Sequence, residues 1–304
     1  MLKCFRPLHQ FSIILLLFSF SSNLKAQDKN TTLFLKKQQT LAERWELERQ
    51  FHKGTFIITP YKPVFVTAGR HTNDPNEKPT SENPAYTQPT EIPYNKYEAK
   101  FQFSLKTKVI YGMFKGRADL WVAYTQKAHW QIYNEELSRP FRELNYEPEV
   151  ILNFPMKFNF LGLTGRMAGI AFNHQSNGQS LPLSRSWNRI IGHIAFEKKQ
   201  FYMMLRGWYR LHDEEDENPL ITDYTGRGEG VFVYNLKKHQ FSLVAASALR
   251  PKNPGRGSVL FSYVFPVVNN FRMQLQVGEG YGETLMDYNH RQTTIGISAS
   301  LIEW

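Results

Sequence analysis

The sequence predicts an all-β protein: a closed antiparallel transmembrane β-barrel of the outer-membrane type, with about twelve strands. Three observations predict it: an export signal with no later apolar run, alternating side chains along most of the chain, and a terminal aromatic residue. Aromatic residues make up 14% of the chain and are spread along it. That spread is typical of a barrel, because only one face of each strand meets lipid.

The amino terminus has the layout of a secretory signal peptide. A basic start precedes the apolar run 11–20, and small polar residues then lead to Ala26. An apolar run of about ten residues is too short to cross a bilayer as a helix, so we expect residues 1–26 to be removed after export. Cys4, the only cysteine, would leave with them. The mature chain would then have neither a disulfide nor thiol chemistry.

Charge and composition exclude several classes of protein. The net charge is +10, but lysine and arginine are scattered without a dense run, and the chain is exported, so we do not expect nucleic acid as a partner. Nothing after residue 20 approaches an uninterrupted apolar run long enough for a membrane-spanning helix. The histidines show no zinc-ligand spacing, which argues against a catalytic transition metal.

Composition divides the mature chain into two parts. Residues 27–54 form a lead-in segment, in which LAERWELERQF fits either one short amphipathic helix or a disordered lead-in. Residues 55–304 would form the transmembrane barrel domain and contain the candidate functional residues described below. Within this part, residues 71–93 are dense in proline, asparagine and threonine and are expected to form a long loop.

Alternation of side chains decides the architecture of residues 55–304. From Tyr97 to Leu105 the odd positions are apolar or aromatic and the even positions are polar, which places each set on one face of a strand. Alternation alone also fits a soluble sandwich, but charged opposite faces and a last strand ending in Trp304 favour a barrel. Twelve such segments occur, near Val64, Phe101, Val122, Leu152, Ile170, Ile190, Met203, Phe232, Leu243, Phe261, Leu275 and Ile297.

The polar stretch AFNHQSNGQSLPLSRSWNR interrupts this regularity. His174 and Ser176 share the parity of Ile170 and Phe172, so both should project from the lipid-facing side of their strand. An imidazole and a hydroxyl are costly in hydrocarbon, which favours a functional role. Alternatively, both lie just above the bilayer edge, where headgroups and water solvate them.

The spacing of these two residues suits nucleophilic catalysis. Side chains at i and i+2 of a strand lie ~7 Å apart at the backbone, so an imidazole can reach a hydroxyl and act as its base. A third group must orient the imidazole, and a neutral amide sometimes does this. Asn188 shares the parity of Ile190 on the returning strand and is the candidate.

Four ordered blocks carry a resemblance to a known family. NHQSNG followed by SRSWNR resembles the active-site signature of the outer-membrane phospholipase A family, and YTQK, PFRELNYEPE and GYGETLMDYN resemble its other blocks in the same order. The resemblance implies a twelve-stranded barrel of the Gram-negative outer membrane, with its active site toward the outer leaflet. It implies hydrolysis of acyl esters of phospholipids and lysophospholipids, of the A1 and A2 types. His174 would be the base, Ser176 the nucleophile and Asn188 the orienting amide.

The resemblance also implies calcium and an active homodimer. Calcium would bind between two barrels, near the backbone N–H of Gly178, which would bind the oxyanion. The carbonyls of Gln179 and Ser184 match the family's ligands. The partner-subunit hydroxyl ligand is aligned with Arg139, so either Ser138 replaces it through a local shift or the site loses a ligand.

Other family positions differ or allow two interpretations. Leu181 and Leu220 replace the acids of the family's weaker calcium site in monomers, which we therefore expect to be absent. The acidic loop 212–218 is expected to be simply solvated, although it could bind cations. Gln126 resembles a membrane-embedded glutamine that holds the two barrels together; alternatively it is a tolerated interfacial polar residue. The alternative function is an inactive pore or structural barrel on the same scaffold.

Overall fold

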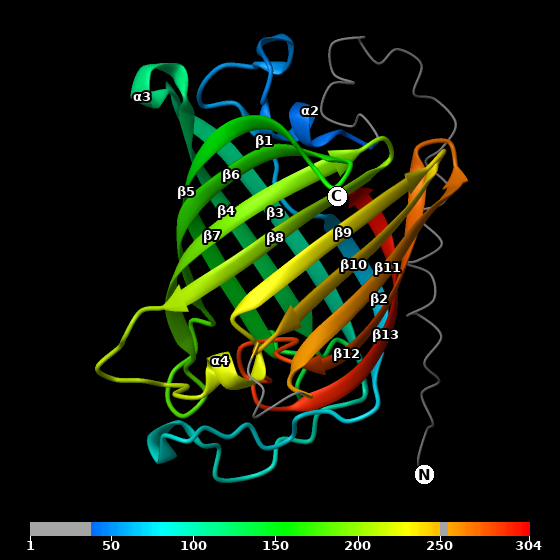
Figure 1. Cartoon of the computed structure of the whole chain (residues 1–304). Helices are drawn as coiled ribbons and strands as arrows, with labels where there is room; N and C mark the ends of the chain where they lie inside the picture. Colours follow the sequence, from blue (N-terminus) through cyan, green and yellow to red (C-terminus); the bar gives the residue numbers. More distant parts are fainter. Residues whose placement is uncertain (1–37, 250–254) are drawn as a thin grey trace, which may run out of the picture. The chain divides into compact units, whose positions relative to one another are not determined.

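An antiparallel barrel is formed by the residues that the computed structural model describes, 38–249 and 255–304 (Figure 1). The predicted signal peptide and the start of the lead-in lie outside these residues. The strands are β1 (Ile58–Pro60), β2 (Val64–Thr72), β3 (Tyr97–Gly112), β4 (Ala118–Trp130), β5 (Glu143–Phe160), β6 (Leu163–Ser176), β7 (Ser186–Lys198), β8 (Phe201–Arg210), β9 (Gly228–Leu236), β10 (His239–Ser247), β11 (Gly257–Val268), β12 (Phe271–Tyr281) and β13 (Arg291–Ile302).

Closure of the barrel follows from the order of its strands. From β2 to β13 each strand pairs with its neighbour in the chain, and the β13–β2 ladder joins the two ends of the sheet. β1 adds only a short pairing to β3. Each of the twelve predicted strand segments lies in one of the strands β2 to β13, so the predicted fold class and strand number are confirmed.

The two ends of the barrel differ in their connections. At one end the strands are joined by short turns, such as the turn at residues 161–162 between β5 and β6. At the other end, long loops join β2 to β3 and β6 to β7, and the loop after β8 contains α4 (Ile221–Tyr224) (Figure 1). Outer-membrane barrels have short periplasmic turns and longer extracellular loops, so the long loops form the outer end.

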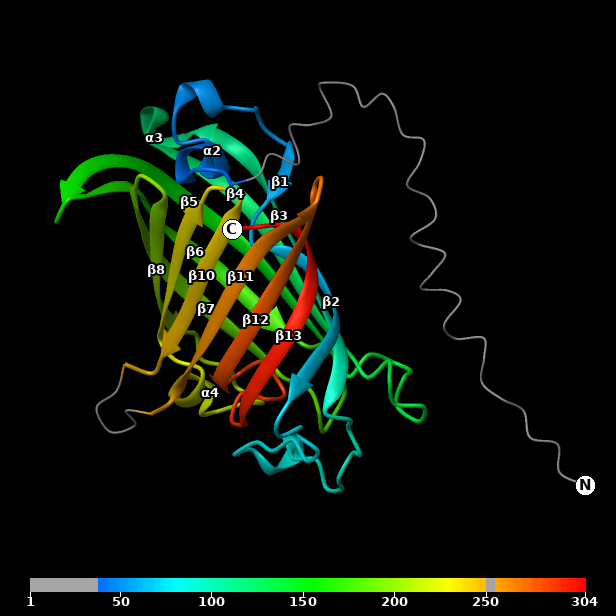
Figure 2. The ribbon, with the colours of Figure 1, turned by 90° about the vertical axis from the view of Figure 1, so that its right-hand side faces the viewer.

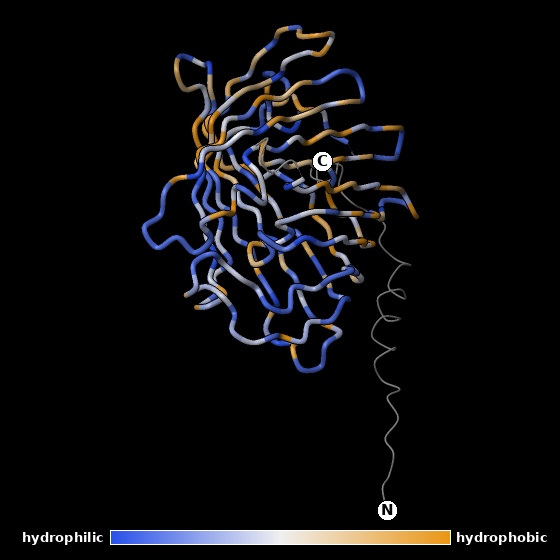
Figure 3. Tube along the Cα trace, turned by 60° about the horizontal axis from the view of Figure 1, so that its bottom comes forward, coloured by the Kyte–Doolittle hydropathy of each residue, from blue (hydrophilic) through white to orange (hydrophobic). Residues whose placement is uncertain are grey.

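Side chains alternate between the lipid-facing surface and the barrel interior as the sequence predicted. In β6, Ile170 and Phe172 are 49% and 44% exposed, while Ala171 and Asn173, which alternate with them, are buried. Apolar and polar residues accordingly alternate along the strands, and the loops of the outer end are mostly hydrophilic (Figure 3). No helix among the described residues is long and apolar enough to cross a membrane.

Ion pairs fill much of the interior. The nitrogen Nζ of Lys62 lies 2.7 Å from a carboxylate oxygen of Glu147, and Arg189 lies 3.2 Å from the same carboxylate. Arg206 pairs with Glu149 at 2.7 Å. A buried charge is tolerated only when it is paired. The charged strand faces that the sequence shows are therefore balanced against one another across the interior.

The lead-in segment forms a short helix against this interior. The helix α2 (Leu41–Trp45) begins with a capping box between Thr40 and Glu43. It ends where Glu46 takes a left-handed conformation, with φ at 53°, so it is shorter than the predicted LAERWELERQF helix. A separate 3-10 turn, Arg49–Phe51, follows it. The alternative of a disordered lead-in does not hold for these residues.

Trp45 anchors α2 inside the periplasmic end of the barrel. It is 4% exposed and packs edge-to-face on Tyr61 and Trp121, with ring centroids 5.9 and 5.7 Å apart. Trp304 packs against the same cluster, and Figure 2 shows α2 and the carboxyl terminus at this end of the barrel. The terminal aromatic residue therefore contributes to the core of the barrel.

Replacing Trp45 by alanine is expected to lower the free energy of unfolding by about 3 kcal/mol, because removal of a buried tryptophan leaves a cavity. The measurement is denaturant unfolding in detergent micelles, followed by tryptophan fluorescence and circular dichroism. Leu161→Ala is the control, since Leu161 is 86% exposed at a short turn and should change the stability little. Equal stability of both variants would contradict a role for α2 in the core.

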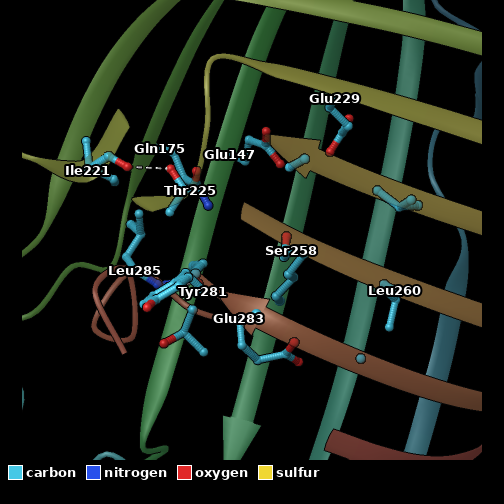
Figure 4. A pocket seen from close by; sticks show the side chains of 18 of the residues that line it. Glu147, Gln175, Ile221, Thr225, Glu229, Ser258, Leu260, Tyr281, Glu283 and Leu285 are labelled. Atoms are coloured by element: carbon cyan, nitrogen blue, oxygen red, sulfur yellow. Dashed lines mark hydrogen bonds between the residues drawn. The ribbon is translucent and has the colours of Figure 1, made fainter. Parts of the chain in front are cut away.

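Residues of strand β7, helix α4 and the loop between β12 and β13 fill the outer end of the interior. Trp187, Ile221, Leu285 and Tyr288 form a buried cluster there. A polar cavity of about 180 Å³ remains in the barrel, lined by charged side chains of several strands. Figure 4 shows this cavity with Glu147, Glu229 and Glu283 among its lining residues.

Candidate active site

His174 and Asn188 face each other across two neighbouring strands. They are Cα partners in the β6–β7 ladder, and Nδ1 of His174 lies 2.8 Å from Oδ1 of Asn188. The backbone carbonyl of Asn188 accepts a hydrogen bond from the N–H of Leu211 at 2.9 Å. The backbone at Asn188 is thus tied to the end of a third strand, β8, and the side-chain amide of Asn188 holds the imidazole.

The residues on either side of His174 point the other way. Asn173 accepts hydrogen bonds from Arg189 in the interior, at 2.6 and 2.9 Å. Gln175 accepts a hydrogen bond from the indole N–H of Trp187 at 2.9 Å and lines the interior cavity (Figure 4). The structure therefore places His174 and Ser176 on the lipid-facing side, and the interior cavity belongs to the opposite face of the same strand.

Ser176 is the last residue of β6, at the outer end of the barrel. Its Cα partners are Tyr146 on β5 and Ser186 on β7. Ser176 is partly exposed, and no hydrogen bond to another described residue uses its hydroxyl. The hydroxyl is free to rotate toward His174, two residues earlier on the same face.

Asn177 organises the loop that follows Ser176. Its Oδ1 accepts hydrogen bonds from the backbone N–H groups of Gln179, at 3.2 Å, and Arg185, at 2.9 Å. Its Nδ2 donates to the carbonyl of Leu183 at 2.8 Å. This buried side chain draws the two ends of the loop together, and our reasoning from the sequence did not identify it. The signal was present, because an asparagine before a glycine is typical of a tight turn.

Gly178 lies on this loop beside the serine. Its φ of 63° is in the left-handed region, where a side chain is disfavoured. A Cβ atom there would lie 3.1 Å from Cε2 of Tyr146, the aromatic neighbour of Ser176. Among the described residues, no hydrogen bond uses the Gly178 N–H. That N–H is available to bind a developing oxyanion. Tyr146 was also missed by the sequence reasoning.

The groups expected to bind calcium are oxygen atoms of the same loop. The hydroxyl of Ser184 donates to Glu217 at 2.7 Å, and the other carboxylate oxygen of Glu217 is buried without a hydrogen-bond partner. In the described part of the chain, no donor is bonded to the carbonyl of Gln179, and no three His, Cys, Asp or Glu residues form a metal cluster. Backbone carbonyls and a hydroxyl are the oxygen ligands that a hard cation such as calcium takes, so the chemistry of these groups fits calcium.

Ser138 and Arg139 lie in the turn between β4 and β5. The carbonyl of Ser138 accepts a hydrogen bond from the indole N–H of Trp130 at 2.8 Å. Neither the Ser138 hydroxyl nor the Arg139 side chain is hydrogen-bonded to any other residue in the described ranges, and Arg139 is exposed. Among the described residues, no hydrogen bond links Ser138 or Arg139 to the loop at 177–185.

Gln126 lies on the same outer face as the serine. Its Oε1 accepts a hydrogen bond from the hydroxyl of Tyr124 at 3.2 Å. Its Cα partners are Phe103 and Tyr146, so Gln126 and Ser176 both flank Tyr146. The side chain of Gln126 is therefore part of the outer surface that surrounds Ser176.

The remaining candidate positions are the two leucines of the weaker calcium site and the acidic loop 212–218. Leu181 and Leu220 are exposed and supply no acid to the loop. The acidic loop is not simply solvated, since Asp216 pairs with Arg210 at 2.5 Å and Glu217 binds Ser184. Its last residues are therefore held against neighbouring groups at the outer end.

A closed barrel with an apolar outer surface, on which a serine, a histidine and an asparagine lie near the outer end, has the architecture of a membrane-facing β-barrel hydrolase. Residues 41–301 match the family model described as Phospholipase A1. The chain belongs to this family, and it is a protein of the Gram-negative outer membrane.

Known relatives are similar to this chain over most of their length. Phospholipase A1 of Escherichia coli K12 is 34% identical over 83% of this chain and 84% of its own length. The calcium-bound dimer of the Salmonella typhi outer membrane phospholipase is 32% identical, with a TM-score of 0.72 over 84% of this chain and 95% of its own. An Escherichia coli outer membrane phospholipase A with an asparagine-to-alanine change in its active site is 30% identical, with a TM-score of 0.73 over 87% and 99%.

Proposed function

We propose that the protein hydrolyses acyl ester bonds of phospholipids and lysophospholipids in the outer leaflet of the outer membrane. Ser176 is the nucleophile, His174 the general base, and Asn188 the amide that orients the imidazole. The observation that carries this proposal is the 2.8 Å contact between His174 and Asn188 on the lipid-facing side, two residues from a free serine hydroxyl. The family's solved active-site mutant, in which an asparagine is replaced, supports the role of Asn188.

The geometry leads to a two-step reaction. Nδ1 of His174 is bonded to Asn188, so Nε2 is the nitrogen that takes the proton as Ser176 attacks the acyl carbonyl. The Gly178 N–H stabilises the oxyanion. His174 then returns the proton to the lysolipid alcohol as it leaves. Water, activated by the same imidazole, releases the fatty acid and restores the serine.

We further infer that calcium and a second copy of the chain complete the site. The carbonyls of Gln179 and Ser184 would hold calcium, whose charge would stabilise the oxyanion. The partner's Ser138 would add a hydroxyl ligand, and Gln126 would lie in the interface. A serine on the outside of a barrel has no cleft of its own, so a neighbouring barrel would supply walls for the acyl chains. The calcium-bound dimer of the Salmonella relative supports this arrangement.

The alternative of an inactive pore is disfavoured by the filled interior. Trp45 and its neighbours occupy the periplasmic end, and Tyr288 and its neighbours occupy the outer end. The cavity between them is lined by charged side chains, most of which are paired. An open conducting channel would need a continuous water-filled path.

Labelling of the serine tests the proposed function. A long-chain alkyl phosphonofluoridate should attach to Ser176 in the presence of calcium, and mass spectrometry of peptides should locate the adduct there. Addition of a chelator should slow the labelling, and fatty-acid release from mixed micelles should fall in parallel. Labelling at another serine, or equal labelling after His174→Ala, would contradict the assignment.

Replacing Asn188 by alanine is expected to lower kcat about ten- to a hundredfold while KM changes little. The imidazole loses the partner that fixes its tautomer and orientation, but the serine and the base remain. Asn188→Gln is the companion variant, which keeps an amide but displaces it by one methylene. The measurement is the rate of fatty-acid release at saturating substrate and calcium. A change confined to KM would speak against an orienting role.

A further inference from the structure

Arg185 is a fully buried cation at the end of the loop that follows the serine. It is 0% exposed, and its guanidinium donates hydrogen bonds to four backbone carbonyls. Two belong to its own loop: Ser184 at 2.7 Å and Pro182 at 3.1 Å. Two belong to the long loop between β2 and β3: Tyr86 at 2.7 Å and Thr80 at 3.2 Å. One side chain thus joins two loops about a hundred residues apart in the sequence.

The segment 79–88 of the β2–β3 loop is itself fixed. It contains a 3-10 turn, Pro84–Tyr86, which is capped by the side chain of Asn83, whose Oδ1 accepts a hydrogen bond from the N–H of Ala85 at 3.2 Å. The N–H of Gln88 donates to the carbonyl of Pro79 at 2.9 Å and closes the segment. The two carbonyls that Arg185 binds are therefore presented at set positions by local structure.

This segment is also bound to the rest of the outer end. Glu82 accepts a hydrogen bond from the hydroxyl of Tyr288 at 2.6 Å. Ser81 and Asn83 donate to the carbonyls of Glu217 and Asp216, at 2.7 and 3.0 Å. The segment 79–88 is therefore a brace, which connects the loop of the serine to the loop between β8 and β9 and to the loop between β12 and β13.

An arginine suits this position better than a lysine. Its planar fork presents donors in two directions, so it can bind the brace and the serine loop at once. The ring of Tyr288 lies 5.9 Å from the guanidinium carbon and contributes a cation–π contact. Burial lowers the pKa of Arg185, and the nearby Tyr288 and Glu143 oppose this lowering. The guanidinium stays charged at neutral pH, because the ordinary pKa of arginine is so high.

The contact with Ser184 is the one that bears on function. A carbonyl oxygen has two lone pairs, and Arg185 uses one of them at Ser184, which leaves one free. We propose that Arg185 is a positioning residue: it is bound to the brace and thereby holds the Ser184 carbonyl in the place where it would bind calcium. This inference rests on the proposed function. Arg185 does not touch the substrate. It acts through the shape of the loop 177–184, so its loss should weaken calcium binding before it affects the chemical step.

Calcium titrations of Arg185→Lys test this inference on the full-length protein in detergent micelles. We expect the calcium affinity, measured by isothermal titration calorimetry and by calcium-dependent dimerisation in sedimentation, to fall about tenfold, because lysine keeps the charge but loses the fork. The maximal rate at saturating calcium should stay close to that of the wild type. Asn83→Ala, which loosens the brace without touching Arg185, should weaken calcium binding in the same direction by a smaller factor.

The control is Arg291→Lys, since Arg291 is an exposed arginine paired with Glu279 and should leave the calcium affinity unchanged. Unchanged calcium affinity in a folded Arg185→Lys variant would overturn the inference, and if that variant does not fold, unchanged affinity in Asn83→Ala would do so. Measurements on the wild type distinguish a failure of this inference about Arg185 from a failure of the proposed function. If wild-type hydrolysis and dimerisation do not respond to calcium, the proposed calcium site itself is wrong.

Discussion

Replacing Ser176 by alanine is expected to reduce phospholipid hydrolysis by roughly 10⁴-fold or more, because the covalent acyl intermediate can no longer form. His174→Ala should cause a similar loss, since the hydroxyl is a weak nucleophile without its base. The two changes should not add, and the double variant should be about as inactive as either single one. Fatty-acid release from phospholipid in mixed micelles, at saturating calcium, is the measurement.

A matched control exists on the neighbouring strand. Ser186 is the Cα partner of Ser176 in the β6–β7 ladder, and it precedes Asn188 by two residues, as His174 precedes Ser176. Ser186→Ala removes a hydroxyl at the same height of the barrel without removing the proposed nucleophile, so it should retain most of the activity. Circular dichroism and thermal unfolding should be the same for both variants. Activity that survives in Ser176→Ala but is lost in Ser186→Ala would reverse the assignment.

The fold could be predicted because barrel strands repeat one simple rule. Each strand places alternate residues toward lipid and toward the interior, so the sequence carries the pattern locally, as in Tyr97–Leu105. The same rule placed His174 and Ser176 on the outer face, where the structure has them. Parity depends only on counting along one strand, and it does not require knowledge of distant contacts.

Contacts between distant segments could not be predicted in this way. The pairing of His174 with Asn188 depends on the register of β6 and β7, which the length and shape of the intervening loop determine. The loop shape depends in turn on Asn177 and on Arg185, whose partners at Thr80 and Tyr86 lie in another loop. Such contacts between a side chain and a distant backbone produce no periodic pattern in the sequence.

The lead-in shows a different limit of periodicity. Its apolar positions fit a helix through Phe51, but the helix ends at Trp45, because Trp45 has to enter the aromatic cluster of the interior. Left-handed backbone at Glu46 turns the chain at that point. Tertiary packing thus overrides local helical preference here, as it commonly does for short helices.

Removal of calcium is expected to lower hydrolysis by a hundredfold or more, on the order of the loss when one oxyanion donor is removed. The expected cause is that a carbonyl of Gln179 or Ser184 cannot by itself stabilise the negative charge next to Gly178. Chelator should abolish fatty-acid release by the wild type, and added calcium should restore it. The barrel itself should not unfold, because its interior ion pairs and Trp45 cluster involve no described group of the calcium loop.

The intersubunit ligand can be separated from the nucleophile by mixing two variants. Ser138→Ala should weaken calcium binding if the partner's Ser138 is a ligand, whereas Arg139→Ser should leave it equal or stronger, since it removes a positive charge beside the site. A Ser138→Ala chain still carries Ser176, and a Ser176→Ala chain still carries Ser138. Their heterodimer therefore has one complete site, so mixing the two preparations should recover up to about a quarter of wild-type activity for random pairing.

That recovery distinguishes the two alternatives left by the sequence: Ser138 supplies the hydroxyl ligand to its partner, or the site loses that ligand. If Ser138 acted within its own chain, or not at all, mixing would produce no site that combines both hydroxyls across an interface. The activity of the mixture would then equal the average of the two separate preparations. Recovery above that average requires that one barrel supplies Ser176 and its partner supplies the hydroxyl ligand. Dimerisation would then be part of the reaction itself, because a single barrel holds only a portion of the groups that stabilise the oxyanion.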